Sequence, residues 1–132
     1  MHNSSIKGTL AYHKVCADLL IKGYEVLDTQ NESLPYDIVA TKNDVFIPIQ
    51  IKYSTDGRIR NLKRSGTSKR VKYDDGDFKY YAIYNPTKDV CIYPSIKYGG
   101  SIIRFEDKRI TGPYFDYQDF LDFTDDAKKD LQ

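Results

Sequence analysis

Three polar residues that flank one apolar run have the chemical types needed for metal-dependent hydrolysis of a phosphodiester. The segment YDIVATKNDVFIPIQIKYS has Asp37 near its start, and Gln50 and Lys52 near its end. Carboxylate and amide oxygens are ligands for hard divalent cations, and a nearby lysine can polarise the attacking water and stabilise charge on the phosphate. The backbone carbonyl of Ile51 is a further candidate ligand. By itself the pattern is weak, because many ordinary strand pairs carry an aspartate and a lysine.

The elements expected on either side of a tight turn bring these residues together. Residues 45–54 alternate as a long strand, so Gln50 and Lys52 share one of its faces. The sequence KND predicts a tight turn that pairs this strand with a strand over residues 36–41. That pairing places Asp37 beside Gln50 and Lys52 at one end of a sheet. The opposite face of the long strand carries the side chains of Ile47, Ile49, Ile51 and Tyr53.

The rest of the pattern predicts an α/β fold with a mixed sheet, and we expect residues 1–132 to form a single domain. A helix is expected from Ser5 to Lys22, ended by Gly23. Its polar residues form a narrow stripe, so we expect it to pack on the sheet and to be buried around most of its circumference. Pro48 cannot donate to a central ladder, which predicts a bulge or an unpaired amide there. Further strands are expected over residues 23–28, 79–85, 89–95 and 101–107, and a short helix over residues 117–123.

The charge is unevenly distributed along the chain. From Lys52 to Lys72 there are eight basic residues and one acid, a net charge of +7, whereas residues 114–132 have six aspartates and two lysines, a net charge of −4. We expect residues 57–72 of the basic segment to be a loop, with a short strand near residues 69–73, and residues 116–132 to be an acidic tail. Such asymmetry indicates an anionic partner for the basic segment, although a solvated loop is the simpler alternative. The candidate DNA-binding residues are Arg58, Arg60, Lys63, Arg64, Lys69, Arg70 and Lys72.

Cysteine usage and hydropathy argue against several classes of protein. Cys16 and Cys91 lie in apolar surroundings and without zinc-binding spacing, which favours small core residues and a reduced, intracellular and cytoplasmic setting. The N-terminus has no long apolar region, so we expect no signal peptide. No run approaches the ~20 apolar residues of a membrane span.

Four segments in order resemble the PD-(D/E)XK endonuclease superfamily. These segments are LLIKGYEVL, YDIVA, IPIQIKYS and FKYYAIYNPTKDVCIYPS, and the similarity covers Lys7 to Phe105. More narrowly, the chain is similar to a small bacterial group that includes group I intron-encoded homing endonucleases. The resemblance implies a restriction-endonuclease-like core and an Mg²⁺- or Mn²⁺-dependent endonuclease acting on double-stranded DNA as a homo-oligomer, a dimer or a tetramer. It also implies that Asp37 is the principal metal ligand, that Gln50 replaces the second acid, and that Lys52 is the catalytic lysine.

One position departs from the family pattern. The family usually has a glutamate in the first helix that points at the metal, and the matching residue here is Tyr12. No glutamate occurs between Met1 and Lys22. Either another acid takes its place, or a single metal binds, or the chain binds DNA but cleaves it poorly. His13 is a further candidate, although a lone histidine beside a buried face is more often a core residue.

Several functions therefore stay open. The first is a metal-dependent DNA endonuclease, with a homing, junction-resolving or restriction role. The second is a DNA-binding relative with impaired catalysis, which the missing helix glutamate favours. The third is a protein-interaction domain or toxin-system partner with a nuclease-like fold. Fold-level analogy does not choose a substrate among them.

Overall fold

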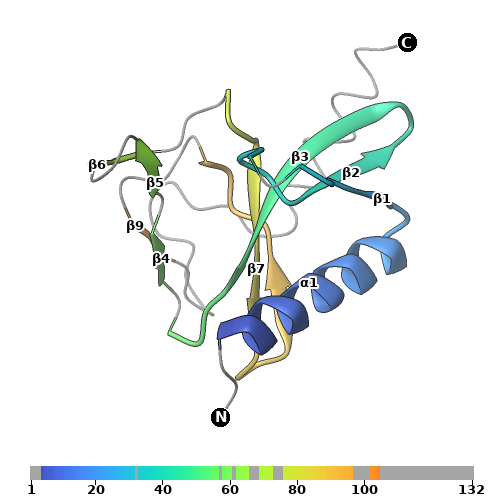
Figure 1. Ribbon diagram of the computed structural model, residues 1–132. Coiled ribbons are helices and arrows are strands. Elements are labelled where there is room, and N and C mark those ends of the chain that lie inside the picture. The colour runs from blue at the N-terminus through green and yellow to red at the C-terminus, as the bar shows by residue number, and fades with distance from the viewer. Residues whose placement is uncertain are drawn as a thin grey trace.

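A five-stranded mixed sheet with one helix packed against it forms the centre of the protein (Figure 1). The computed structural model describes residues 4–31, 33–56, 58–60, 62–65, 69–72, 76–96 and 102–104. The strand order is β1-β2-β3-β7-β8; β3 and β7 run parallel, and the other neighbours are antiparallel. This confirms the predicted α/β class and mixed sheet. The strands are β1 (Glu25–Asp28), β2 (Ile38–Lys42), β3 (Val45–Tyr53), β7 (Tyr80–Asn85) and β8 (Val90–Ile92).

Helix α1 (Ser4–Ile21) lies where the sequence predicted it. It ends in a Schellman motif, because the amide of Gly23 donates to the carbonyl of Leu20 at 3.0 Å and the amide of Tyr24 donates to the carbonyl of Leu19 at 2.9 Å. This motif needs a residue with positive φ, and Gly23 has a φ of 90°.

The helix buries less of its surface than predicted. Its buried residues Ala11, Val15 and Leu19 form one stripe at a spacing of four, and this stripe packs on the sheet. Leu20 and Ile21, in contrast, are 58% and 84% exposed. The expectation of burial around most of the circumference was wrong, because an apolar composition does not show how much of a helix the neighbouring sheet can cover.

The hairpin of β2 and β3 has the predicted form. Asn43 and Asp44 connect the strands with φ values of 54° and 67°, as a two-residue type I′ turn requires. The expected bulge at Pro48 is absent, because this residue pairs with Val39 in an unbroken register. The carbonyl of Pro48 accepts from the amide of Lys79 at 3.1 Å, so its backbone faces the β7 side. Pairing with β7 begins one residue later, which leaves no ladder donor for the proline to break.

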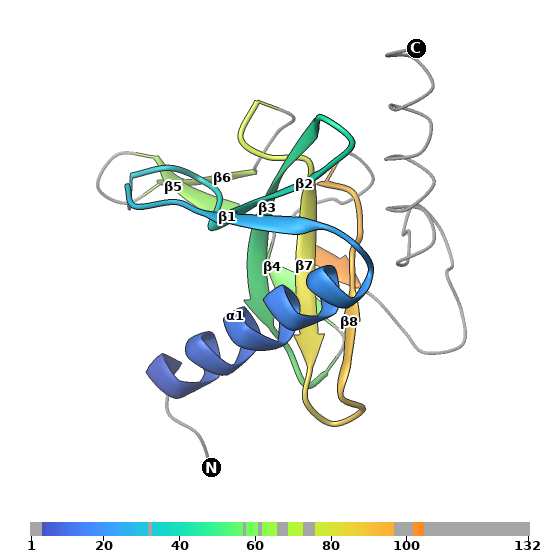
Figure 2. The same cartoon turned by 90° about the vertical axis from the view of Figure 1, so that its right-hand side faces the viewer.

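The two faces of the sheet carry separate apolar clusters. On one face, α1 packs over the alternate β3 residues Ile47 and Ile49. On the other face, Tyr81 and Ile83 of β7 pack with Ile59, which belongs to the segment after β3. Figure 2 shows α1 in front of the sheet and β4 behind it. The sheet is therefore covered on both sides, with different elements on each.

The short strand predicted near residues 69–73 of the basic segment is confirmed as β6 (Lys69–Lys72), but the prediction of a loop for the preceding basic residues was wrong, because they also form strands. These preceding strands are β4 (Arg58–Arg60) and β5 (Leu62–Ser65). Strands β5 and β6 pair as an antiparallel hairpin, and β4 pairs with β9 (Ile102–Arg104), which lies within the predicted strand 101–107. The predicted helix over 117–123 and the acidic tail over 116–132 lie outside the described residues.

Candidate active site

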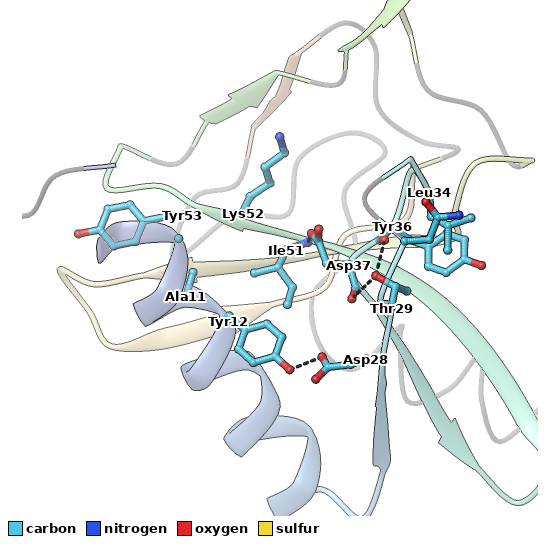
Figure 3. Close-up of a pocket in the computed structure, with 12 residues that line it drawn as sticks. Ala11, Tyr12, Asp28, Thr29, Leu34, Tyr36, Asp37, Ile51, Lys52 and Tyr53 are labelled. Carbon is cyan, nitrogen blue, oxygen red and sulfur yellow. Dashed lines mark hydrogen bonds between the residues drawn. The ribbon is translucent and has the colours of Figure 1, made fainter. Parts of the chain in front are cut away.

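A cavity of about 440 Å³ opens between α1, the end of β1, the start of β2 and the end of β3. Figure 3 shows how its walls combine the helix with the three strands. Asp37 and Lys52, two of the three residues selected from the sequence pattern, line it together with Ile51. The full set of twelve lining residues is Gly8, Ala11, Tyr12, Asp28, Thr29, Asn31, Leu34, Tyr36, Asp37, Ile51, Lys52 and Tyr53.

Asp37 lies just before β2, where the regular pairing with β3 stops. Ile38 pairs with Ile49, so a continued register would set Asp37 opposite Gln50. Instead, the amide of Asp37 donates to the carbonyl of Ile49 at 2.9 Å. The amide of Ile51 then donates to Asp37 Oδ2 at 2.7 Å. The carboxylate therefore takes the place of a backbone acceptor and is held at the end of the sheet, beside β3.

Burial disfavours the charged form of both Asp37 and Lys52. Loss of hydration raises the pKa of the Asp37 carboxyl above its ordinary value, while the Ile51 amide and the Lys52 charge act in the opposite direction. Burial lowers the pKa of the Lys52 ammonium, and the charge of Asp37 partly offsets this. Asp37 is still accessible to solvent as a whole residue. Each group favours the charged form of the other, but not enough to cancel the cost of desolvation. A divalent cation beside Asp37 would favour its charged form.

Gln50 lies beside Asp37 in the sheet, as expected, because Asp37 is bonded to the residues on either side of it, Ile49 and Ile51, but Gln50 does not line the cavity. It is half-buried and pairs in register with Tyr81 of β7. Its Oε1 atom is buried. Gln50 and Lys52 share a face of β3, as the alternation predicts, but only Lys52 reaches the cavity. Lys52 rises from β3 on the side opposite Ile51 (Figure 3).

Tyr12 of α1 reaches into the cavity and meets an acid that sequence reasoning missed. Its hydroxyl donates a hydrogen bond to Oδ1 of Asp28, the last residue of β1 (Figure 3). This contact and burial raise the pKa of the Tyr12 hydroxyl well above its ordinary range. His13, the other candidate from the helix, is exposed and packs edge-on against the ring of Tyr12, with 5.3 Å between the ring centroids; it does not line the cavity.

A signal for Asp28 was present in the sequence but could not be read without the strand pairing. Asp28 ends the strand predicted over residues 23–28. Its closeness to Asp37 follows only once β1 is known to pair antiparallel with β2, with Asp28 opposite Ile38. The hydroxyl of Thr29 also donates to the carbonyl of Asp37 at 3.1 Å, which joins the two strand ends.

Comparison with known proteins decides the family. A profile of the PD-(D/E)XK endonuclease family matches residues 2–120. The chain belongs to this family. This match confirms the resemblance to PD-(D/E)XK endonucleases that the four sequence segments indicated. A search of curated protein sequences gave no match.

Two solved structures share the fold of this PD-(D/E)XK endonuclease. One is the bacterial homing endonuclease I-Ssp6803I, with a TM-score of 0.76 and 22% identity, covering 97% of this chain and 99% of the other. The other is Hjc, a Holliday junction resolvase from Archaeoglobus fulgidus, with a TM-score of 0.57 and 12% identity, covering 86% of this chain and 94% of the other. Both support the restriction-endonuclease-like core.

The oxygen atoms in the cavity of this PD-(D/E)XK endonuclease suit a hard divalent cation. Asp28, Asp37, Thr29 and Asn31 all line the cavity, and their side chains carry two carboxylates and two neutral oxygens. Mg²⁺ prefers such ligands and keeps several of its waters, so it does not need a cage of protein atoms. The described residues contain no group of three or more His, Cys, Asp or Glu side chains placed to hold a metal. The donor set therefore fits a cation held by few protein charges.

The basic strands of the PD-(D/E)XK endonuclease follow directly on the strand that carries Lys52. Their backbone register sets Arg64 opposite Arg70 and Arg58 opposite Arg104, and Arg60 is exposed. Figures 1 and 2 place these strands on the side of the main sheet away from α1. Within the described residues, no helix has the length and apolar character needed to cross a membrane.

Proposed function

We propose that the protein is a divalent-metal-dependent DNA endonuclease. The observation that carries the proposal is that Asp37 and Lys52 line one cavity of a PD-(D/E)XK chain, with the carboxylate held in place by the Ile51 amide at 2.7 Å. A desolvated acid beside a desolvated lysine in a cavity is typical of functional sites, because catalysis uses burial and neighbouring charges to shift pKa values.

Each residue has a role in the proposed reaction. Asp37 and the backbone carbonyl of Ile51 would hold Mg²⁺ or Mn²⁺. In a strand the amide and the carbonyl of one residue point to the same side, and the Ile51 amide is bonded to Asp37. Such a cation neutralises the scissile phosphate and acidifies a water. Lys52 orients the attacking water and stabilises the charge that develops on the phosphate. Gln50 was the expected second ligand, and its buried Oε1 and its position outside the cavity support a lesser role.

DNA is the proposed substrate, and the basic strands are its proposed binding surface. Arginine and lysine residues on β4, β5 and β6 would neutralise backbone phosphates and position the duplex across the cavity. The two structural neighbours are named for different DNA tasks, homing and junction resolution. Comparing cleavage of a linear duplex pool with cleavage of a four-way junction separates these roles for this chain.

Cleavage of both strands favours a homo-oligomer, a dimer or a tetramer. The chain contributes one such cavity among its described residues, and a duplex offers two antiparallel strands related by two-fold symmetry. Sedimentation of the protein alone and on target DNA measures the assembly. A monomer that makes double-strand breaks at single-turnover concentrations would contradict this part of the proposal.

The experiment that tests the proposed function is DNA cleavage with and without Mg²⁺ or Mn²⁺, comparing the parent with Asp37→Asn. Asp44→Asn is the matched control, because Asp44 lies on the same hairpin at the turn and its positive φ of 67° suits asparagine. We expect metal-dependent cutting that Asp37→Asn abolishes and Asp44→Asn leaves unchanged. Equal cutting by both variants would contradict the proposal.

A catalytically impaired DNA-binding relative is the second candidate. The observation that favours it is Tyr12, which stands where the family usually has a helix glutamate and contributes no carboxylate. Salt-dependent DNA binding without cleavage on a diverse substrate pool, together with no cation binding by calorimetry, would favour this candidate over a nuclease with a rare target.

A further inference from the structure

We propose that Asp28 supplies the second carboxylate of the cation site and that Tyr12 is the residue that positions it. This inference rests on the proposed function, because it assigns two further residues to the same site. Its starting point is the cavity, which is lined by both Asp28 and Asp37 although neither sequence spacing nor the family pattern connects them.

The strand pairing places the backbones of the two acids next to each other, and both residues line the cavity. Asp28 is the last residue of β1 and pairs with Ile38, the neighbour of Asp37. The hydroxyl of Thr29 donates to the carbonyl of Asp37 at 3.1 Å, so the end of β1 is tied to the start of β2. Both carboxylates therefore stand on backbone that the sheet fixes, which suits a site that must hold its geometry.

The helix holds Asp28 from the opposite wall. The hydroxyl of Tyr12 donates to Oδ1 of Asp28, and this bond spans the cavity from α1 to β1 (Figure 3). The bond occupies one lone-pair site of a carboxylate that has about four, so oxygen sites are left for a cation or for its bound waters.

The charges separate Asp28 from other aspartates with the same kind of contact. Three aspartates accept a tyrosine hydroxyl in the described residues: Asp18 from Tyr93, Asp28 from Tyr12, and Asp89 from Tyr84. Asp18 also forms an ion pair with Lys22, and Asp89 forms one with Lys14 at 3.0 Å. Within the part of the chain that the structure describes, Asp28 forms no ion pair. Its negative charge is left for a partner from outside the protein, in the cavity that already contains Asp37.

The test is Mn²⁺ titration of the full chain by calorimetry and electron paramagnetic resonance, without DNA. Asp28→Asn keeps an acceptor for Tyr12 and removes only the charge, whereas Tyr12→Phe keeps the charge and removes the anchor. Asp89→Asn is the matched control, since it has the same tyrosine contact but a lysine partner. We expect Asp28→Asn and Tyr12→Phe each to weaken Mn²⁺ binding by on the order of 10-fold. Asp89→Asn should bind as the parent does.

A double variant distinguishes positioning from simple structural damage. If Tyr12 acts through Asp28, adding Tyr12→Phe to Asp28→Asn produces no further loss of Mn²⁺ affinity. Additive losses would overturn the positioning role of Tyr12. Parental affinity in Asp28→Asn, or no Mn²⁺ binding by the parent, would overturn the assignment of Asp28.

The outcomes for this inference and for the proposed function differ. If Asp37→Asn loses Mn²⁺ binding and cleavage while Asp28→Asn keeps both, the inference fails and the nuclease proposal stands. If Asp28→Asn loses Mn²⁺ binding while Asp37→Asn cleaves DNA as well as the parent does, the proposed nuclease site fails and the inference stands.

Discussion

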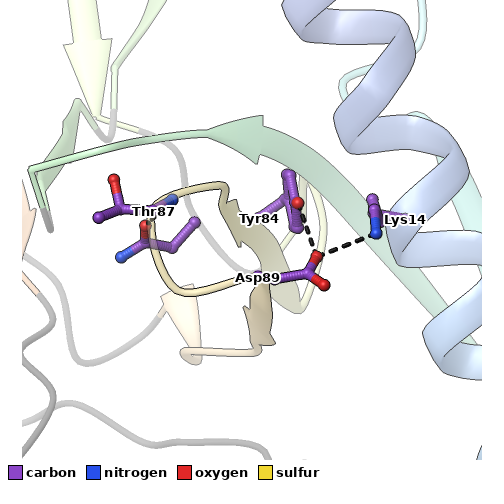
Figure 4. A network of polar contacts seen from close by, with 5 residues as sticks. Lys14, Tyr84, Thr87 and Asp89 are labelled. Atoms are coloured by element: carbon purple, nitrogen blue, oxygen red, sulfur yellow. Dashed lines mark hydrogen bonds and ion pairs between the residues drawn. The ribbon is translucent and has the colours of Figure 1, made fainter.

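Two groups that each contain a tyrosine–aspartate hydrogen bond join α1 to the sheet, and they differ in one charge. In the first, Lys14 of α1 forms an ion pair with Asp89 at 3.0 Å, and the hydroxyl of Tyr84 donates to the same Asp89 oxygen at 2.7 Å (Figure 4). The Lys14 ammonium also lies 5.7 Å from the centre of the Tyr84 ring. In the second, Tyr12 donates to Asp28 and no lysine completes the group within the described residues.

The same kind of hydrogen bond therefore occurs in two different electrostatic settings. The Tyr84 hydrogen bond, followed by the Lys14 charge, lowers the pKa of the Asp89 carboxyl, while burial and the bond to Asp89 raise the pKa of Tyr84 to about 12. We call Lys14, Tyr84 and Asp89 the closed group, because the lysine charge balances the aspartate charge. This group connects the helix to the β7–β8 turn. The Tyr12 group lines a cavity and has no lysine partner among the described residues, which is why we propose a cation there and none at Asp89.

The largest expected effect is on catalysis. We expect Lys52→Ala to reduce cleavage by on the order of 10²–10³-fold, because it removes a positive group beside the reacting phosphate. Its affinity for DNA should stay within several-fold of the parent. Lys14→Ala is the control, since it removes a lysine from the closed group. Rates from single-turnover cleavage and affinities from fluorescence anisotropy measure both. Loss of cleavage and affinity together would make Lys52 a phosphate anchor.

The next effect concerns the basic strands, which lie outside both tyrosine groups. Neutralising Lys63, Arg64, Lys69 and Arg70 should weaken binding to all DNA sequences alike. It should also reduce the slope of log affinity against log salt by roughly 3–4, at about 0.9 per lost phosphate contact. Binding isotherms at several salt concentrations measure the slope. An unchanged slope would put the DNA on another face of the protein.

A smaller effect is expected on the pH dependence of stability, through Asp37 in the cavity. Because the folded state raises the pKa of Asp37, it binds the proton more tightly than the unfolded chain does, so this group's contribution to stability decreases as pH rises through the window between the two pKa values. Asp37→Asn removes that penalty and can still accept from the Ile51 amide. We expect it to be more stable than the parent to urea at neutral pH, with the gap closing in acid. A gap that widens in acid would contradict the raised pKa.

The smallest effect is expected at the closed group. Asp89 is a surface residue, and exposed ion pairs contribute little to stability. We expect Asp89→Asn to leave cleavage unchanged and to reduce the melting temperature only slightly, with part of the reduction lost in the Lys14→Ala background. Calorimetric melting of the two single variants and the double variant measures this coupling. A change in cleavage rate at Asp89 would break the contrast between the two groups.

Local sequence signals predicted the elements well because they depend on neighbouring residues. Gly23 ended the helix, Asn43 and Asp44 formed the turn, and alternation placed Gln50 and Lys52 on one face. Depth is not a local property. Gln50 lies opposite Tyr81 within the sheet, whereas Lys52, two residues further on, lines the cavity.

The misses share this origin. The exposure of Ile21 depends on how far the sheet extends under α1, and regular pairing at Pro48 depends on where β7 begins. Asp28 became a candidate only through contacts with β2 and with Tyr12, which are far from it in sequence or on another element. Residue spacing and family resemblance both pointed to Asp37 and Lys52, but neither could point to a residue that the family pattern does not contain.

The amide of Ile51 is a natural reporter for the site. Its proton is hydrogen-bonded to the Asp37 carboxylate and not to a strand carbonyl, so a cation that binds this carboxylate also changes the environment of this one amide. Its NMR chemical shift and its exchange rate with deuterium should therefore follow cation binding at equilibrium, in the absence of DNA and of any turnover. One nitrogen-15 resonance would then measure occupancy of the cavity in the intact protein.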